Sequence, residues 1–378
     1  MPVFADVNGD GFIDLAAFPR LGDGAHVWLG DGKGAWRDSS KELALPFSCG
    51  GGLAFGDFGK LGRLDLAAAD HCAGVFVYRN AGQGSWEESA GPINPLASNQ
   101  KSSADGEEQD EENELQGGEA IAAGDVNGDG FIDLAVASSM EGGITVYFGD
   151  GSGRSWTEAE SDGLPKSGFA DKIMLKDIDG DGHLDVFASY SDGPRVWKGD
   201  GKGNWQDYSQ GLPISTAGGR YRGIAAGDVN EDGRLDLAVA HILNGPEIFL
   251  QSSGGTWQQT APLQSALKGG ATAVALGDLD GDGHVDLVAG GSQTESDEYG
   301  LFVFQGDGKA GWTGIEGTEL PSKELIYIWG IALADVNGDG LLDMAVTTGG
   351  SPPKRQKSET LPRMQVWLNQ FRKGIPKS

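Results

Sequence analysis

Acidic and amide side chains recur along this chain in one nine-residue pattern, Asp-x-Asp/Asn-x-Asp-Gly-x-x-Asp. The pattern places side-chain oxygens at positions 1, 3, 5 and 9 of a short loop, and position 7 offers a backbone carbonyl. Ca²⁺ binds about six to eight oxygen ligands, whereas Zn²⁺ prefers His and Cys and Mg²⁺ keeps its waters in a tight octahedron. Glycine at position 6 permits the sharp turn that directs the ligands inward. The pattern therefore predicts a Ca²⁺-binding loop.

Six copies of the loop are complete in side-chain ligands, so we expect six Ca²⁺ sites. The predicted side-chain ligands are Asp6, Asn8, Asp10 and Asp14; Asp125, Asn127, Asp129 and Asp133; Asp177, Asp179, Asp181 and Asp185; Asp228, Asn230, Asp232 and Asp236; Asp278, Asp280, Asp282 and Asp286; and Asp335, Asn337, Asp339 and Asp343. The predicted backbone ligands are the carbonyls of Phe12, Phe131, His183, Arg234, His284 and Leu341. The alternative interpretation is six Asp/Gly turns that bind no metal.

A seventh copy of the loop is degenerate. It keeps Asp57 and Asp65, but Gly59 and Leu61 stand at positions 3 and 5, where they supply no side-chain oxygen. We therefore predict that this copy binds no metal.

The elements that position these loops repeat with them. Successive loops begin 50 to 68 residues apart, and short apolar segments such as Gly223–Gly227 and Leu237–Ala240 flank each loop. A third apolar segment follows, then a Gly-rich turn and a Trp that opens a fourth. Four short strands per repeat, seven times over, predict an all-β, seven-bladed β-propeller of four-stranded blades in a single domain over residues 1–378. A linear solenoid is the main alternative fold.

The last repeat breaks the pattern. Only 11 residues of this sequence follow Trp367, and they lack the Gly-rich turn and the Trp. We expect the last blade to be irregular or incomplete, and completion by a neighbouring chain would give self-association through blade seven.

Composition and charge exclude several classes of protein. Glycine contributes 64 of 378 residues, which disfavours a helix-rich fold. The net charge of −28 opposes binding to nucleic acid. No apolar run is long enough to cross a bilayer, so we expect no membrane insertion.

The repeats resemble the FG-GAP or VCBS repeats of integrin α-subunit head domains and of many secreted bacterial and fungal proteins and lectins. The resemblance rests on the six loops quoted above and covers nearly the whole chain. It implies a seven-bladed propeller in which structural Ca²⁺ sites join the first two strands of each blade. This sequence departs from the family pattern in three respects: one loop is degenerate, the Gly-Ala-Pro element is scarce and Arg-Gly-Asp is absent.

Residues that vary between repeats are the candidates for ligand binding. The residue type varies from repeat to repeat at the position six residues before each loop, which lies at the same end of every first strand. We predict that Arg220, Tyr221, Arg222, Tyr327 and Trp329 line one mouth of the central channel and contact a ligand. Blade-to-blade packing is the alternative role. The acidic insertion at residues 97–117 and the connections at 292–300 and 349–363 fit solvated loops.

The two cysteines flank the degenerate loop. Cys49 precedes Asp57 by eight residues and Cys72 follows Asp65 by seven, so a hairpin brings them nearly opposite each other. We predict a disulfide that clamps the blade without metal, and hence an extracellular, periplasmic or cell-surface location.

No catalytic set can be assigned from the sequence. We therefore favour a Ca²⁺-binding, non-catalytic recognition or adhesion module for glycans or a protein partner. The first alternative is a polysaccharide-cleaving enzyme that uses Tyr221 with Arg220 or Arg222. The second alternative is a structural part of a surface assembly.

Overall fold

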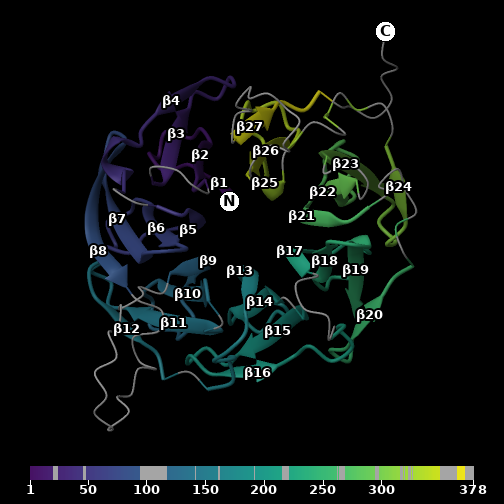
Figure 1. Ribbon diagram of the computed structural model, residues 1–378, viewed down its shortest axis with the longest axis horizontal. Coiled ribbons are helices and arrows are strands. Elements are labelled where there is room, and N and C mark those ends of the chain that lie inside the picture. Colours follow the sequence, from purple (N-terminus) through teal and green to yellow (C-terminus); the bar gives the residue numbers. More distant parts are fainter. Residues whose placement is uncertain are drawn as a thin grey trace.

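The computed structural model shows a ring of seven β-sheets (Figure 1). It describes residues 1–370 except 20–23, 46–47, 94–116, 141, 161, 191, 215–220, 262, 264–268, 294–297, 316–317, 319, 322–324, 326 and 350–363. The described residues contain no α-helix and one 3₁₀ turn, η1 (Lys41–Leu43). No helix among them is long and apolar enough to span a membrane. The acidic insertion lies almost wholly outside the described residues.

Each blade is an antiparallel sheet whose strands follow chain order. Blade 1 has β1 (Pro2–Ala5), β2 (Asp14–Ala17), β3 (His26–Gly30) and β4 (Trp36–Asp38); blade 2 has β5 (Gly51–Gly56), β6 (Asp65–Asp70), β7 (Gly74–Gly82) and β8 (Ser85–Ile93). Blade 3 has β9 (Gly118–Gly124), β10 (Asp133–Ser138), β11 (Ile144–Gly149) and β12 (Trp156–Glu158); blade 4 has β13 (Ala170–Lys176), β14 (Asp185–Tyr190), β15 (Gly193–Gly199) and β16 (Trp205–Asp207). Blade 5 has β17 (Tyr221–Gly227), β18 (Asp236–His241), β19 (Gly245–Gln251) and β20 (Trp257–Gln259); blade 6 has β21 (Ala271–Gly277), β22 (Asp286–Gln293), β23 (Glu298–Gly306) and β24 (Trp312–Gly314).

Blade 7 differs from the others. It contains β25 (Ile328–Ala334), β26 (Asp343–Thr348) and β27 (Met364–Trp367), with no fourth strand among the described residues. The predicted seven-bladed propeller with an incomplete last blade is therefore confirmed.

The first strand of every blade lies toward the centre of the ring (Figure 1). Small residues let these inner strands approach closely. A Cβ on Gly52 would lie 2.8 Å from the backbone nitrogen of Ile121 in blade 3, and one on Gly330 would lie 2.8 Å from Pro2 Cδ. β1 and β25 contact each other and bring the two ends of the ring together.

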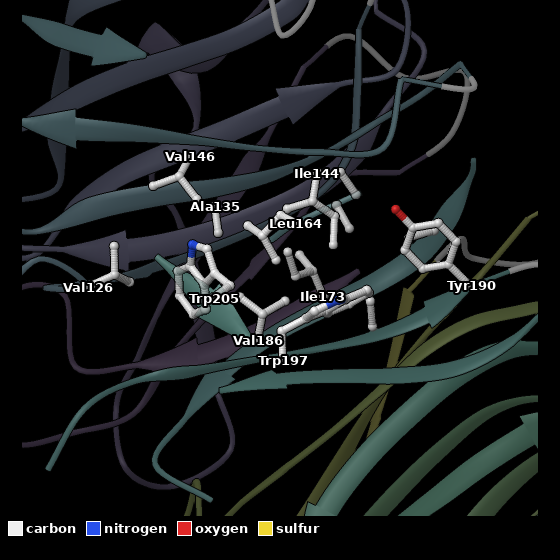
Figure 2. Close-up of a cluster of buried hydrophobic side chains, with 14 of the residues drawn as sticks. Val126, Ala135, Ile144, Val146, Leu164, Ile173, Val186, Tyr190, Trp197 and Trp205 are labelled. Atoms are coloured by element: carbon white, nitrogen blue, oxygen red, sulfur yellow. The ribbon is translucent and has the colours of Figure 1, made fainter. Parts of the chain in front are cut away.

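The hydrophobic core lies between blades rather than within them. Figure 2 shows the cluster between blades 3 and 4, where Val126, Ala135 and Ile144 face Ile173, Val186 and Trp205. Similar clusters join blades 1 and 2, 2 and 3, 4 and 5, 5 and 6, and 6 and 7. Five of the six fourth-strand Trp residues belong to these clusters and so pack between blades: Trp86, Trp156, Trp205, Trp257 and Trp312.

Candidate functional site

The acidic loops connect the first and second strands of their blades, as the sequence predicts. In blade 3, Asp125 accepts hydrogen bonds from the backbone N–H groups of Gly128 and Gly130, both at 2.8 Å. The two glycines adopt φ of 75° and 82°, a left-handed conformation that glycine tolerates without strain. This hydrogen bonding folds positions 1 to 6 back on themselves and holds the Asp125 carboxylate.

The last Asp of each complete loop is buried and ties the loop to the third strand. Asp133 accepts the backbone N–H of Val126 at 2.9 Å and that of Gly149, at the end of β11, at 3.0 Å. Both bonds leave a lone pair on each carboxylate oxygen for a metal. The equivalent residues make the same two bonds: Asp14, Asp185, Asp236, Asp286 and Asp343.

Burial makes these carboxylates costly to ionise. It raises the pKa of Asp133, Asp185, Asp236 and Asp286 to about 6, although the two backbone hydrogen bonds lower it. The neighbouring carboxylates of the same loop raise the pKa further. A divalent cation at this position would favour the ionised form, because an opposite charge stabilises a carboxylate.

Two loops bring three carboxylates to spacings that one ion can bridge. Oxygens of Asp177, Asp179 and Asp185 lie within 4.8 Å of one another, and so do those of Asp278, Asp280 and Asp282. Two ligands at about 2.3 to 2.6 Å from a single Ca²⁺ cannot be more than about 5 Å apart, so these sets fit the ion. Hard oxygen donors without His or Cys also match its chemistry.

The loops differ in the groups around them. The Lys198 ammonium forms an ion pair with Asp179 and lies 3.7 Å from an Asp181 oxygen. In blade 6, Gln305 Nε2 donates to Asp280 at 2.5 Å. These contacts place a cationic donor beside the ligand set of blade 4 and an amide donor beside that of blade 6.

The degenerate loop keeps the turn and lacks the ligands. Asp57 accepts the N–H groups of Leu61 at 2.7 Å and Gly62 at 2.8 Å, and Asp65 accepts that of Gly59 at 3.1 Å. No side-chain oxygen is available at Gly59 or Leu61. The prediction that this copy binds no metal stays a prediction.

Cys49 and Cys72 form the predicted disulfide, with their Cα atoms 5.6 Å apart. The bridge joins the chain before β5 to the turn after β6, and the buried Asp70 carboxylate accepts N–H groups from both cysteines. The disulfide and these hydrogen bonds therefore stabilise one end of blade 2, and the degenerate loop lies at the other end.

A small hollow opens at the other end of the inner strands. Blades 1, 2, 3, 4 and 7 contribute to its lining, which includes Gly51, Glu119, Lys172, Trp329, Thr347 and Thr348. Thr347 is 2% exposed, and its hydroxyl has no hydrogen-bond partner among the described residues. We call this hollow the channel mouth. Its lining differs from blade to blade.

The five predicted ligand-binding residues have different surroundings. Arg220 lies outside the described residues. Tyr221 is 4% exposed in the core between blades 4 and 5, where its ring meets His241 edge-on at 4.8 Å and burial raises its pKa to about 12. Tyr327 and Trp329 have ring centroids 4.5 Å apart, and Trp329 lines the channel mouth.

Arg222, in blade 5, interacts with residues of blades 4 and 7. Its Nη1 donates to both carboxylate oxygens of Asp171 in blade 4, at 2.8 and 3.0 Å. It also interacts electrostatically with Tyr327 of blade 7. The structure thus brings Arg222, Tyr327 and Trp329 to the same end of the ring, whereas Tyr221 is buried in the core between blades 4 and 5.

The sequence did not single out a second polar pair at this end. His71 Nδ1 lies 2.6 Å from an oxygen of Glu119, which is 3% exposed, so the contact links blades 2 and 3. Glu119 stands at a variable first-strand position, which is the one signal that could have identified it. His71 gives no such signal, because its partner lies 48 residues away.

Comparison with known proteins matches the fold and the repeats. A family model for the FG-GAP-like repeat matches residues 125–187, 177–239 and 229–289. No curated protein matches the sequence.

Two solved structures resemble this fold over most of their length. One is that of a lectin of Agrocybe aegerita, described as recognising non-reducing terminal N-acetylglucosamine; it is 17% identical, with 83% of this chain and 78% of that chain covered and a TM-score of 0.52. The other is BBS1N in complex with ARL6DN, soaked with lead; it is 12% identical, with 92% and 88% covered and a TM-score of 0.57. At these identities the likeness concerns the fold alone.

Proposed function

This chain is a seven-bladed β-propeller that carries FG-GAP-like repeats, and from that premise we propose that it is a Ca²⁺-stabilised, non-catalytic recognition module. The ligand is a glycan or a protein. The observation that carries the proposal is the contrast between a scaffold that repeats in every blade and a channel mouth whose lining does not repeat.

Calcium has a structural role in this proposal. Each complete loop would hold one ion through its four side chains and the carbonyl at position 7, six ions in all. The last Asp of the loop hydrogen bonds to the third strand, so a bound ion would fix the relation between three strands of a blade. Without the ion, like charges repel one another across each turn.

The channel mouth supplies the recognition surface. Trp329 offers an aromatic face that suits a sugar ring or an apolar side chain. Around it, Glu119, Lys172 and Thr347 offer both charges and a hydroxyl to polar groups of a ligand. The Agrocybe aegerita lectin and the BBS1N complex are consistent with recognition on a propeller of this kind.

An extracellular, periplasmic or cell-surface location belongs to the same proposal. The Cys49–Cys72 disulfide requires an oxidising compartment to persist. Ca²⁺ at roughly millimolar concentration outside cells would also fill loops of the affinity expected for exposed modules.

Binding to a glycan array in the presence of Ca²⁺ tests the recognition role. We expect selective binding that Trp329→Ala weakens at least tenfold. Leu61→Ala is the matched control, because Leu61 is 52% exposed on the degenerate loop at the opposite end of the inner strands and belongs to no predicted Ca²⁺ site. The same array serves protein ligands if extracellular proteins are printed beside the glycans. Equal loss in both variants, or binding that Trp329→Ala leaves unchanged, would contradict the assignment of the mouth.

Melting curves in chelator and in Ca²⁺ test the metal role separately. We expect chelation to lower the melting temperature of the wild-type protein and calorimetric titration to give about six sites. Identical melting curves in both buffers would exclude a structural role for Ca²⁺.

A further inference from the structure

Among the described residues, the third strand of blade 7 has no partner strand along its outer edge. In the other six blades the third strand pairs on both sides, as β3 does with β2 and β4, whereas among the described residues β27 pairs with β26 alone. Leu368, just after β27, is 42% exposed, while its counterpart Leu29 is 4% exposed. An edge strand with unpaired backbone groups is a template for another strand.

One hydrogen bond that repeats around the ring shows what the edge would bind. Three residues after the Trp of the fourth strand, a backbone N–H donates to the carbonyl of an aliphatic residue in the third strand. The pairs are Ser39 to Val27, Ala159 to Val146, Tyr208 to Val196, Thr260 to Ile248 and Ile315 to Val303, at 2.8 to 2.9 Å. The counterpart in blade 7 is Val366, because Trp367 pairs with Met344 as Trp28 pairs with Leu15. The Val366 carbonyl therefore points outward.

The repeat also marks the position that a Trp would occupy beside this edge. Five fourth-strand Trp residues pack against the core shared with the preceding blade: Trp86, Trp156, Trp205, Trp257 and Trp312. Trp86 Nε1 also donates to the Ser39 carbonyl at 2.9 Å, and Trp257 Nε1 donates to that of Tyr208 at 2.8 Å. In the described core between blades 6 and 7 no such Trp occurs, and the matching carbonyl is that of Ile315.

Blade 2 is the best template for the missing strand. Where four of the other third strands end in Gly, blade 2 has Asn80 and blade 7 has Asn369. Each Asn amide donates to two backbone carbonyls, at 2.6 and 3.1 Å in both blades. Asn80 pairs with Trp86, which is 4% exposed, so this Asn leaves room for a buried Trp.

The residues of this sequence beyond 370 do not match the template. Trp86 follows Asn80 by six residues, and six residues after Asn369 stand Ile375 and then Pro376. The residue after the Trp faces the third strand, as Arg37 faces Leu29, and proline has no N–H to donate there. Residues 371–378 lie outside the described residues, and their sequence supplies neither the Trp nor this donor.

We propose that the outer edge of β27 binds an extended, Trp-led segment from outside residues 1–378, antiparallel to β27, with the Trp seated between Asn369 and Ile315. The segment carries polar residues after the Trp, as the strands beginning at Trp36, Trp156 and Trp205 do. A second copy is the less suitable occupant, because the described Trp-led strands are already paired within their own blades and each copy carries a net charge of −28. The segment would complete the sheet by strand addition.

A labelled peptide with the sequence of residues 82–90 tests the proposal on the full chain. Fluorescence anisotropy is expected to show saturable binding, and the Trp86→Ala peptide is expected to bind at least tenfold more weakly, because a buried Trp dominates such contacts. No binding of the parent peptide, or equal binding of both peptides, overturns the proposal.

Two variants at one position locate the binding edge. Leu368→Pro removes an N–H that corresponds to the one Leu29 directs toward β4, whereas Leu368→Ala keeps it. We expect Leu368→Pro to weaken peptide binding at least tenfold and Leu368→Ala to stay within about threefold of wild type. Equal binding by both variants contradicts the assignment of the edge. A dimer in light scattering that Leu368→Pro dissociates identifies a second copy as the occupant and also overturns the proposal. If Leu368→Pro does not fold, the comparison of the parent and Trp86→Ala peptides on the wild-type protein tests the proposal.

Discussion

A calcium site can be built into the blade that lacks one. The change is Gly59→Asp with Leu61→Asp, which supplies the two missing oxygens between Asp57 and Asp65. The backbone is ready for it, because Lys60 has φ of 52°, close to the 58° of Glu231 at the same position of a complete loop. A Cβ on Gly59 meets no heavy atom nearer than 3.6 Å, and Leu61 is 52% exposed.

We expect this double substitution to stabilise the fold in Ca²⁺ and to destabilise it in chelator. For a dissociation constant of about 0.1 mM and about 5 mM Ca²⁺, one added site stabilises the fold by about 2.3 kcal/mol. For a chain of this size that corresponds to a rise in melting temperature of about 3 °C. In chelator, the two added carboxylates face Asp57 and Asp65, and the repulsion costs about 1 to 2 kcal/mol.

Differential scanning calorimetry measures the shift, and calcium titration counts the sites. The matched control is Gly59→Ser with Leu61→Ser, which adds oxygens without charge. We expect the Asp variant to bind one more Ca²⁺ than wild type and the Ser variant to bind none in addition. An unchanged stoichiometry, or a fall in melting temperature in both buffers, would refute the reasoning about these loops.

Three further changes probe other parts of the ring. Burial raises the pKa of Asp171 to about 6, above its usual value, so ionisation of this side chain opposes folding. Between pH 4 and 7, the unfolding free energy of the wild-type protein should therefore fall by up to about 3 kcal/mol relative to that of Asp171→Asn. Urea titrations of both proteins measure this difference, and a rise would contradict the expectation. Replacing Cys49 and Cys72 with Ser removes a disulfide that closes a loop of sequence separation 23, and it should lower the unfolding free energy by about 3 kcal/mol. An unchanged midpoint of chemical denaturation would show that the disulfide does not stabilise the fold. Gly52→Ala should destabilise the fold by about 1 to 3 kcal/mol, because the added Cβ lies 2.8 Å from a backbone nitrogen of the next blade. Gly59→Ala is the control and should change the stability little. Similar shifts in melting temperature for both variants would contradict the close packing of the inner strands.

The sequence predicted the scaffold well because the scaffold repeats. The Asp and Gly positions recur with the strands around them, so one repeat informs the next, and Trp36 and Trp205 begin fourth strands as expected. The disulfide followed from the symmetry of one hairpin. Local pattern and internal repetition were sufficient for these features.

The channel mouth was less predictable because it depends on contacts between blades. Tyr221 and Arg222 are adjacent in sequence, yet Tyr221 is buried in the core between blades 4 and 5 and Arg222 binds Asp171, 51 residues away. Side-chain alternation separates them, and only the register of β17 decides which of the two faces the centre. Arg220 lies outside the described residues, and the ligand roles of the remaining candidates stay predictions.

The sharing of core clusters between neighbouring blades has a mechanical consequence. Among the described residues, such clusters join six junctions of the ring, whereas blades 7 and 1 meet through contacts of β1 with β25 and β26, the close approach of Pro2 to Gly330 and that of Leu368 to Gly34. A stretching force across the ring would therefore part it at this seam first. The remaining blades would stay joined to one another as an open arc.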